Sequence, residues 1–173
     1  MKKSSGIIVY KQARDGVLHV LIAHMGGPFW AKKDNGGWSI PKGELVGDGE
    51  DLLAVAIREF EEELGGPPPE GEYIELGELK QPSGKRITVF ALEGDFDSEN
   101  ITSNTFEMEW PRGSGKIETY PEIDRAAWLP AALARSKLVK GQVGFIDRLI
   151  EKLAERGIEV SEGAGAQMDG TLF

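Results

Sequence analysis

The sequence predicts an α/β protein, more broadly α+β, in which a mixed β-sheet is packed between helices. Short segments rich in β-branched residues come first, then one segment of helical periodicity, further strands and a second helix. The 173 residues suffice for one domain with a substantial core, and 40% of them are hydrophobic. This order of elements favours a sheet that is covered by a helix on each face.

The first two strands are predicted to form a hairpin. Residues 6–10 and 17–24 are rich in Ile, Val and Leu, and the turn-forming residues 14–16 separate them. A loop with several glycines and lysines over 26–37 leads to a short strand at 38–40. We expect this loop to border the functional site, because it leads directly into the most distinctive segment of the chain.

That segment, residues 43–66, places a glycine-rich loop before an amphipathic helix predicted over about 50–64. Four apolar side chains fall on one stripe of the helix: Leu53, Ile57, Phe60 and Leu64. Three carboxylates gather on nearly the opposite side: Glu59, Glu62 and Glu63. Two glycines and three prolines follow and end the helix.

The three glutamates indicate a metal site that binds phosphates. Like charges three and four residues apart repel, so the cluster lowers helix stability unless a cation lies among the carboxylates. Ligands that are all oxygen favour a hard ion, Mg²⁺ or Mn²⁺. The alternative is a solvated acidic helix, which is disfavoured because an ordinary exposed face would mix lysine among the glutamates.

The remaining elements follow from periodicity and turn residues. Strands are predicted at 73–80, 86–93, 105–110 and 126–129, a short helix at 130–135 and a second main helix at 142–156. In the third of these strands Phe106, Met108 and Trp110 share one face. We expect one domain over 1–160 and a flexible, glycine-rich tail over 161–173.

From Glu50 onward the acidic segment resembles the signature of the Nudix hydrolase family. That signature reads Gly, five residues, Glu, seven residues, Arg-Glu, an aliphatic or aromatic residue, any residue, Glu-Glu, any residue and Gly. Here seven residues separate Glu50 from Arg58, and the residues that follow match through Gly65. Two positions depart from the pattern. Six residues instead of five separate Gly43 from Glu50, and Gly66 stands where a bulky apolar residue is usual.

The resemblance implies a Nudix-type α/β/α sandwich that hydrolyses a pyrophosphate bond in a nucleoside diphosphate linked to a group X. It also implies that Glu59, Glu62 and Glu63, with the backbone of Gly43, bind the metal. Glu59 could in addition orient or deprotonate the attacking water. Glu50 and Arg58 would support the loop and the carboxylates without binding metal.

Further site residues are candidates of lower specificity. Many family members use an acidic residue from a later loop, and Glu122 is the best positional match, with Glu107 and Glu109 as alternatives. Two cations, Lys42 and Arg86, are candidates to bind the substrate's phosphates. The aromatic residues Phe29, Trp30 and Tyr10 could stack on a base. Surface or core roles explain each of these residues as well. His19 and His24 are predicted to be packing residues.

Composition limits the partners. The formal net charge of −9 disfavours polynucleotides, and the absence of cysteine excludes disulfides and zinc–thiolate sites. No apolar stretch approaches the length of a membrane span, which favours a cytoplasmic protein. For the substrate we expect dinucleoside polyphosphates or nucleoside triphosphates first, then ADP-ribose or another nucleotide sugar. Two alternatives remain: a catalytically silent Nudix-fold module that binds or senses a nucleotide, and an acidic interaction protein.

Overall fold

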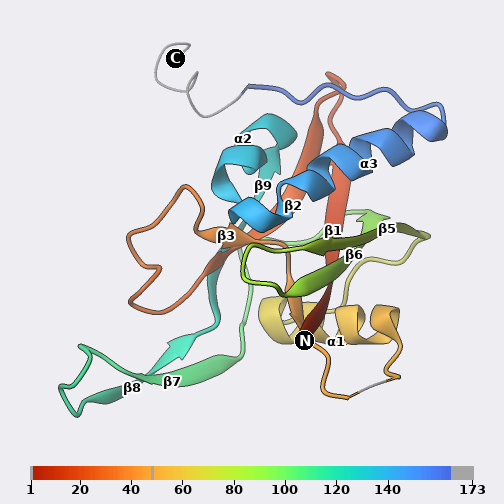
Figure 1. The fold of residues 1–173 in the computed structure, drawn as a ribbon. Coiled ribbons are helices and arrows are strands. Elements are labelled where there is room, and N and C mark those ends of the chain that lie inside the picture. Colours follow the sequence, from red (N-terminus) through yellow and green to blue (C-terminus); the bar gives the residue numbers. More distant parts are fainter. Residues whose placement is uncertain (1, 48, 165–173) are drawn as a thin grey trace.

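A computed structural model describes residues 2–47 and 49–164, in which a seven-stranded mixed sheet lies between helices (Figure 1). The central strand β1 (Lys3–Gln12) pairs antiparallel with β2 (Leu18–Met25) and parallel with β6 (Arg86–Glu93). Strand β6 pairs antiparallel with β5 (Tyr73–Lys80). Three more strands complete the sheet: β3 (Trp38–Ser39) and β9 (Ile123–Pro130) on β2, and β4 (Lys42–Glu44) on β1.

The helices cover both faces of this sheet. Helix α1 (Leu52–Leu64) lies on one face, and α2 (Ala131–Lys137), a 3₁₀ turn (Lys140–Gln142) and α3 (Gly144–Glu155) lie on the other (Figure 1). Each face has its own apolar cluster, one containing Phe60 and Leu64 of α1 and the other Phe145 and Leu149 of α3. The predicted arrangement of a mixed sheet between helices is therefore confirmed.

Most predicted elements are present. The first hairpin, β5, β6, α2 and α3 lie where the sequence predicts them. Helix α1 begins at Leu52, because Asp51 caps it by accepting a hydrogen bond from the backbone N–H of Ala54 at 3.1 Å. It ends at Leu64 and is capped by Gly65, whose φ of 81° is left-handed.

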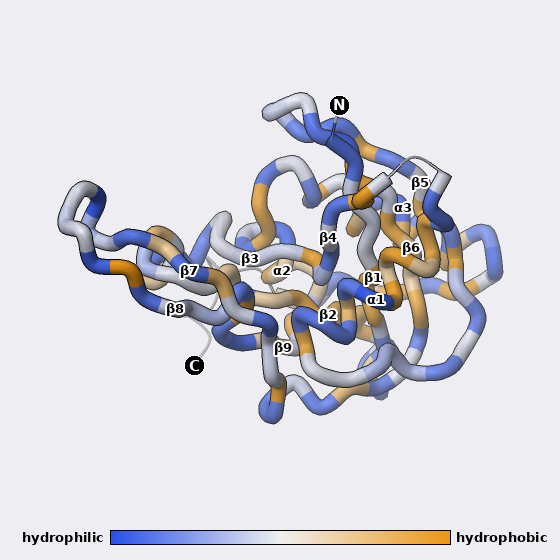
Figure 2. The backbone as a smooth tube through the Cα atoms, turned by 90° about the horizontal axis from the view of Figure 1, so that it is seen from below, coloured by the Kyte–Doolittle hydropathy of each residue, from blue (hydrophilic) through white to orange (hydrophobic). Residues whose placement is uncertain are grey.

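Two strands are absent from the prediction. Strand β4 has three residues, too few to show a period of two, and one of them is Gly43. Strand β8 (Ile117–Pro121) pairs with β7 (Thr105–Glu109) in a separate two-stranded ribbon, which extends away from the body of the protein (Figures 1 and 2). The residues of β8 are exposed or half-buried, so no apolar alternation marks that strand in the sequence.

The buried face of α1 is wider than predicted. Phe60 and Leu64 are buried as expected, but Val55 is buried as well. Val55, Glu59 and Glu63 follow one another at intervals of four residues, so they lie along one line of the helix. The prediction that these two glutamates lie opposite the core was wrong, because both side chains contact β4, Glu59 at Gly43 and Glu63 at Lys42.

The last residues that the structure describes are hydrogen-bonded to β2 and α2. The backbone N–H of Leu18 donates to Ser161 O at 2.7 Å, and that of Ala132 donates to Glu162 O at 2.9 Å. The rest of the predicted flexible tail, residues 165–173, lies outside the described residues. No helix within 2–47 and 49–164 is long and apolar enough to cross a membrane.

Gly65 allows a test of the packing at the end of α1. A Cβ at Gly65 would lie 2.6 Å from Thr102 O, whereas a Cβ at Gly84, whose φ of 93° is also left-handed, would meet nothing within 4 Å. We expect Gly84→Ala to lower the free energy of unfolding by about 1–2 kcal/mol, the cost of a left-handed alanine. Gly65→Ala should lower it by roughly 1–3 kcal/mol more, measured by urea unfolding. Equal losses would contradict the close packing.

Candidate active site

The carboxylate of Glu59 lies directly against the backbone of β4. A Cβ at Gly43 would be 1.7 Å from Glu59 Oε1, so only glycine permits this approach. Burial raises the pKa of Glu59, and the neighbouring carboxyl of Glu62 raises it further, while Arg58 acts in the opposite direction. Glu59 and Glu62 therefore form a close pair of like charges beside a strand backbone.

Glu63 is the most desolvated of the three carboxyls on helix α1 that belong to the Nudix signature. The backbone N–H of Lys42 donates to Glu63 Oε1 at 3.3 Å. Burial raises the pKa of Glu63 to about 8, the charges of Glu122 and Glu59 add to the increase, and Lys42 opposes it. Glu63 also lines a cleft, so the residue keeps partial exposure although protein surrounds much of its carboxyl.

Backbone hydrogen bonds connect the segment that contains Glu122 to the end of α1. The backbone N–H of Glu122 donates to Asn104 O at 2.8 Å, and that of Asn104 donates to Glu62 O at 2.8 Å. Glu122 and Glu63 line the same cleft. The structure thus brings Glu122 beside Glu63 of α1, which precedes it by about sixty residues.

Glu50 and Arg58 lie on the outer side of the carboxylates. Glu50 Oε1 accepts hydrogen bonds from the backbone N–H groups of Val46 at 2.5 Å and Gly47 at 3.0 Å. Glu50 Oε2 lies 3.4 Å from Arg58 Nη1, and Arg58 Nε lies 3.5 Å from Glu59 Oε2. The loop with its additional residue therefore still provides backbone donors to Glu50.

A cleft of about 470 Å³ opens beside Glu63 and Glu122. Apolar side chains form most of its wall: Met25, Phe29, Trp30, Phe106, Met108 and Ile123. Phe29 and Trp30 come from the loop after β2, and Phe106 and Met108 come from the β7–β8 ribbon. The loop approaches the ribbon closely, since a Cβ at Gly27 would lie 2.7 Å from Phe106 Cζ. One end of the cleft is acidic, and the rest suits a flat apolar group.

The candidate substrate-binding residues differ in their positions. Lys42 lines the cleft, as do Phe29 and Trp30. Arg86 is not among the residues that line it; it begins β6 and forms an ion pair with Glu78 at 2.9 Å. Tyr10 is buried in the cluster on the α3 face of the sheet.

Several cleft residues were not predicted as site residues. Phe106 and Met108 were predicted only to share one face of a strand, and in the structure both line the cleft. The alternation of apolar and polar residues in this strand was visible in the sequence, but the sequence did not show which surface its apolar face would contact. Nothing in the sequence marked Met25 as a site residue, because it is the last residue of an apolar strand and could equally have belonged to the core. Glu109, an alternative to Glu122, accepts hydrogen bonds from the backbone of Gly113 at 2.8 Å and Gly115 at 3.1 Å within the ribbon turn.

Comparison with known proteins assigns the family. A family model described as the NUDIX domain matches residues 2–149. The chain belongs to the Nudix hydrolase family. No curated protein sequence matches it.

Solved structures share the Nudix fold at low sequence identity. The binary complex of an Ap4A hydrolase from C. elegans is 18% identical, with a TM-score of 0.58 over 90% of this chain and 99% of the other. The NUDIX domain of Shewanella oneidensis NrtR, solved with ADP-ribose, is 16% identical with a TM-score of 0.58, covering 87% of each chain. A MutT protein from Methanosarcina mazei Go1 is 17% identical with a TM-score of 0.54, covering 87% and 94%.

The donor set of this Nudix protein fits the divalent ions that the family generally uses. Within the described ranges, no three His, Cys, Asp or Glu side chains already stand in an ion-holding arrangement. Glu59 lies near Arg58, and Glu63 accepts a hydrogen bond from Lys42. The raised pKa values of Glu59 and Glu63 nevertheless show that their ionised forms are disfavoured in the metal-free protein, and bound cations would stabilise those forms.

The raised pKa of Glu63 predicts a pH-dependent stability. The ordinary pKa of 4.5 applies in the unfolded chain and a pKa of about 8 in the folded, metal-free protein. Between these values the folded protein binds a proton that the unfolded chain does not, so this contribution to stability is lost as pH rises. We expect the Glu63→Gln variant not to lose this contribution to stability as the pH rises, because glutamine does not ionise.

The measurement is urea unfolding with EDTA at about pH 5 and about pH 9. On going from the lower to the higher pH, the variant should gain stability relative to wild type by on the order of a few kcal/mol. Parallel pH profiles for the two proteins would show that Glu63 is not desolvated as described.

Proposed function

We propose that this Nudix protein hydrolyses a pyrophosphate bond in a nucleoside diphosphate linked to X, by attack of water on phosphorus. The observation that carries the proposal is a chain of neighbouring carboxylates beside an apolar cleft. Glu63 and Glu122 line the cleft, Glu59 lies close enough to raise the pKa of Glu63, and Glu62 is the neighbour of Glu59. Breaking such a bond builds negative charge on phosphoryl oxygens, which positioned cations neutralise. The cleft would hold the planar base while the acidic end acts on the phosphates.

Mg²⁺, with Mn²⁺ as a substitute, is the proposed cofactor. Glu59, Glu62 and Glu63 would hold it together with the carbonyl of Gly43, since all four supply oxygen ligands. Bound there, it would neutralise phosphate charge and lower the pKa of a coordinated water.

The chain's own groups would orient the reactants. Glu59 is the candidate to orient or deprotonate the water, because its carboxylate is held against β4 and its pKa is raised. Glu122 is a second candidate at the edge of the cleft. Lys42 would bind a phosphate through its ammonium group. Arg86 remains a weaker candidate for phosphate binding, because it lies outside the cleft lining.

Dinucleoside polyphosphates and nucleoside triphosphates are the favoured substrates. The cleft wall is mainly aromatic and sulfur-containing, which suits a nucleobase better than a sugar. The Ap4A hydrolase of C. elegans supports the first class, and the ADP-ribose complex of NrtR keeps nucleotide sugars as the second. A cytoplasmic location fits these substrates and stays a prediction.

The function is tested with a panel of nucleotides, with and without magnesium. Wild type should release a nucleoside monophosphate or pyrophosphate, and EDTA should abolish turnover. Glu62→Gln combined with Glu63→Gln should lower kcat by about 100-fold or more, because the shape remains while two charges are lost. Glu61→Gln is the control, since Glu61 is exposed on the same helix. Nucleotide binding without turnover in wild type would instead support the silent module.

Gly43 provides a second test of the same geometry. The added Cβ of Gly43→Ala must displace the Glu59 carboxylate, which it would meet at 1.7 Å. We expect kcat to fall by about 100-fold, the usual effect of misplacing a catalytic group by about 1 Å. Gly66→Ala should stay close to wild type, because its Cβ would make ordinary contact with Phe96 at 3.7 Å. Full activity of Gly43→Ala would argue against Glu59 acting at β4.

A further inference from the structure

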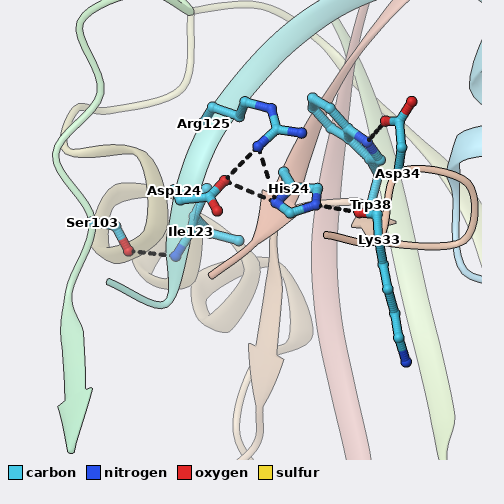
Figure 3. A network of polar contacts seen from close by, with 8 residues as sticks. All are labelled: His24, Lys33, Asp34, Trp38, Ser103, Ile123, Asp124 and Arg125. Atoms are coloured by element: carbon cyan, nitrogen blue, oxygen red, sulfur yellow. Dashed lines mark hydrogen bonds and ion pairs between the residues drawn. The ribbon is translucent and has the colours of Figure 1, made fainter. Parts of the chain in front are cut away.

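His24 is a fully buried residue of β2 whose two ring nitrogens each face an oxygen atom (Figure 3). Nδ1 lies 2.8 Å from Asp124 Oδ1, and Nε2 lies 2.6 Å from the main-chain oxygen of Lys33. The ring meets Trp38 edge-on, with 5.3 Å between ring centroids. These contacts fix both the position and the plane of the imidazole ring.

One end of this network reaches the aromatic wall of the cleft. The ammonium of Lys33 lies 3.7 Å from the ring centroid of Phe29 and 5.1 Å from that of Trp30. Both rings line the cleft. By holding the main chain at Lys33, His24 therefore restrains the residue whose side chain covers both rings.

The other end reaches the segment that forms the facing part of the cleft. Asp124 follows Glu122 and Ile123, which both line it. The backbone N–H of Ile123 donates to Ser103 Oγ at 3.0 Å (Figure 3), and that of Gly26 donates to Glu122 O at 2.8 Å. Asp124 Oδ1 also lies 3.4 Å from Arg125 Nη1. The Asp124 end of the contact is thus held in place by its own neighbours.

The second half of the loop is held separately. Trp38 Nε1 donates to Asp34 Oδ1 at 3.0 Å, and Asp34 also pairs with Lys137 of α2. Those contacts hold this part of the loop against β3 and α2. His24 is the side chain that contacts both the aromatic loop, at Lys33, and the Glu122 side, at Asp124.

We propose that His24 is a positioning residue for the cleft. Through Asp124 and Lys33 it keeps the wall formed by Phe29 and Trp30 at a fixed spacing from Glu122 and Ile123. It thereby sets the affinity for the planar group of the substrate without touching the reacting atoms. The assignment of that planar group as a nucleobase rests on the proposed function; the mechanical role of His24 does not.

Two substitutions separate the two contacts of His24. His24→Asn keeps a donor near the position of Nδ1, facing Asp124, and loses the contact with Lys33. His24→Gln keeps a donor near the position of Nε2, facing Lys33, and loses the contact with Asp124. His19→Asn is the matched control, because His19 lies on the same strand and its Nδ1 contacts only a local oxygen in the described structure, Val17 O at 3.1 Å.

The experiment combines amide hydrogen exchange with steady-state kinetics, well below the lowest unfolding midpoint of the variants. Both His24 variants should exchange faster at residues 27–33, because the side-chain bridge between Lys33 and Asp124 is broken. Both should raise KM for the best nucleotide by about tenfold and change kcat by less than about twofold, since only binding of the remote group is weakened. His19→Asn should match wild type in both measurements.

Three outcomes would overturn the proposal: unchanged exchange and KM in either His24 variant, a fall in kcat at constant KM, or equal effects of His19→Asn. A purely structural role would lower the unfolding midpoint without changing KM. If wild type turns over no nucleotide, the proposed function fails on its own. Exchange at 27–33 and the Kd of a non-hydrolysable ATP analogue, measured by calorimetry, then decide the role of His24 by the same criteria.

Discussion

The close packing of α1 against β4 is the constraint on which the site depends. It places the Glu59 carboxylate where only a glycine fits at position 43, and it directs Glu63 at the backbone of Lys42. Burying a carboxylate is unfavourable without a counter-ion, which is the main reason why the pKa of Glu63 rises to about 8; the nearby charges of Glu122 and Glu59 add to the rise. The fold thus uses core packing energy to hold an arrangement of carboxylates that a helix in solution would avoid.

In the proposed function, recognition of the base and chemistry at the phosphates use different parts of one cleft. The acidic end comes from α1 and the residues before β9, whereas the aromatic wall comes from the loop after β2 and from the β7–β8 ribbon. Phe29 and Phe106 belong to segments outside the main sheet, so they can vary without disturbing the carboxylates.

Features of this protein could be predicted from the sequence where the whole pattern lies within one helix or strand. The Nudix spacing lies almost wholly within one helix, so the family and the candidate role of Glu59 and Glu62 could be predicted from that segment alone. Contacts between distant segments could not be predicted, because they depend on strand register. His24 and Asp124 are 100 positions apart, and Arg86 lies outside the cleft lining because it pairs with Lys3 at the start of β1. The burial of Glu59 and Glu63 was missed for the same reason, since β4 is too short to predict.

The central claim is that the carboxylates of α1 exist to bind divalent cations that bridge the substrate's phosphates. The most direct test is a crystal structure with Mn²⁺ and a non-hydrolysable nucleotide, in which anomalous scattering locates the metal. The account predicts manganese bound to oxygens of Glu59, Glu62 and Glu63, with phosphates beside it and the base between Phe29 and Phe106. Manganese and nucleotide bound elsewhere, with these three side chains free, would contradict it.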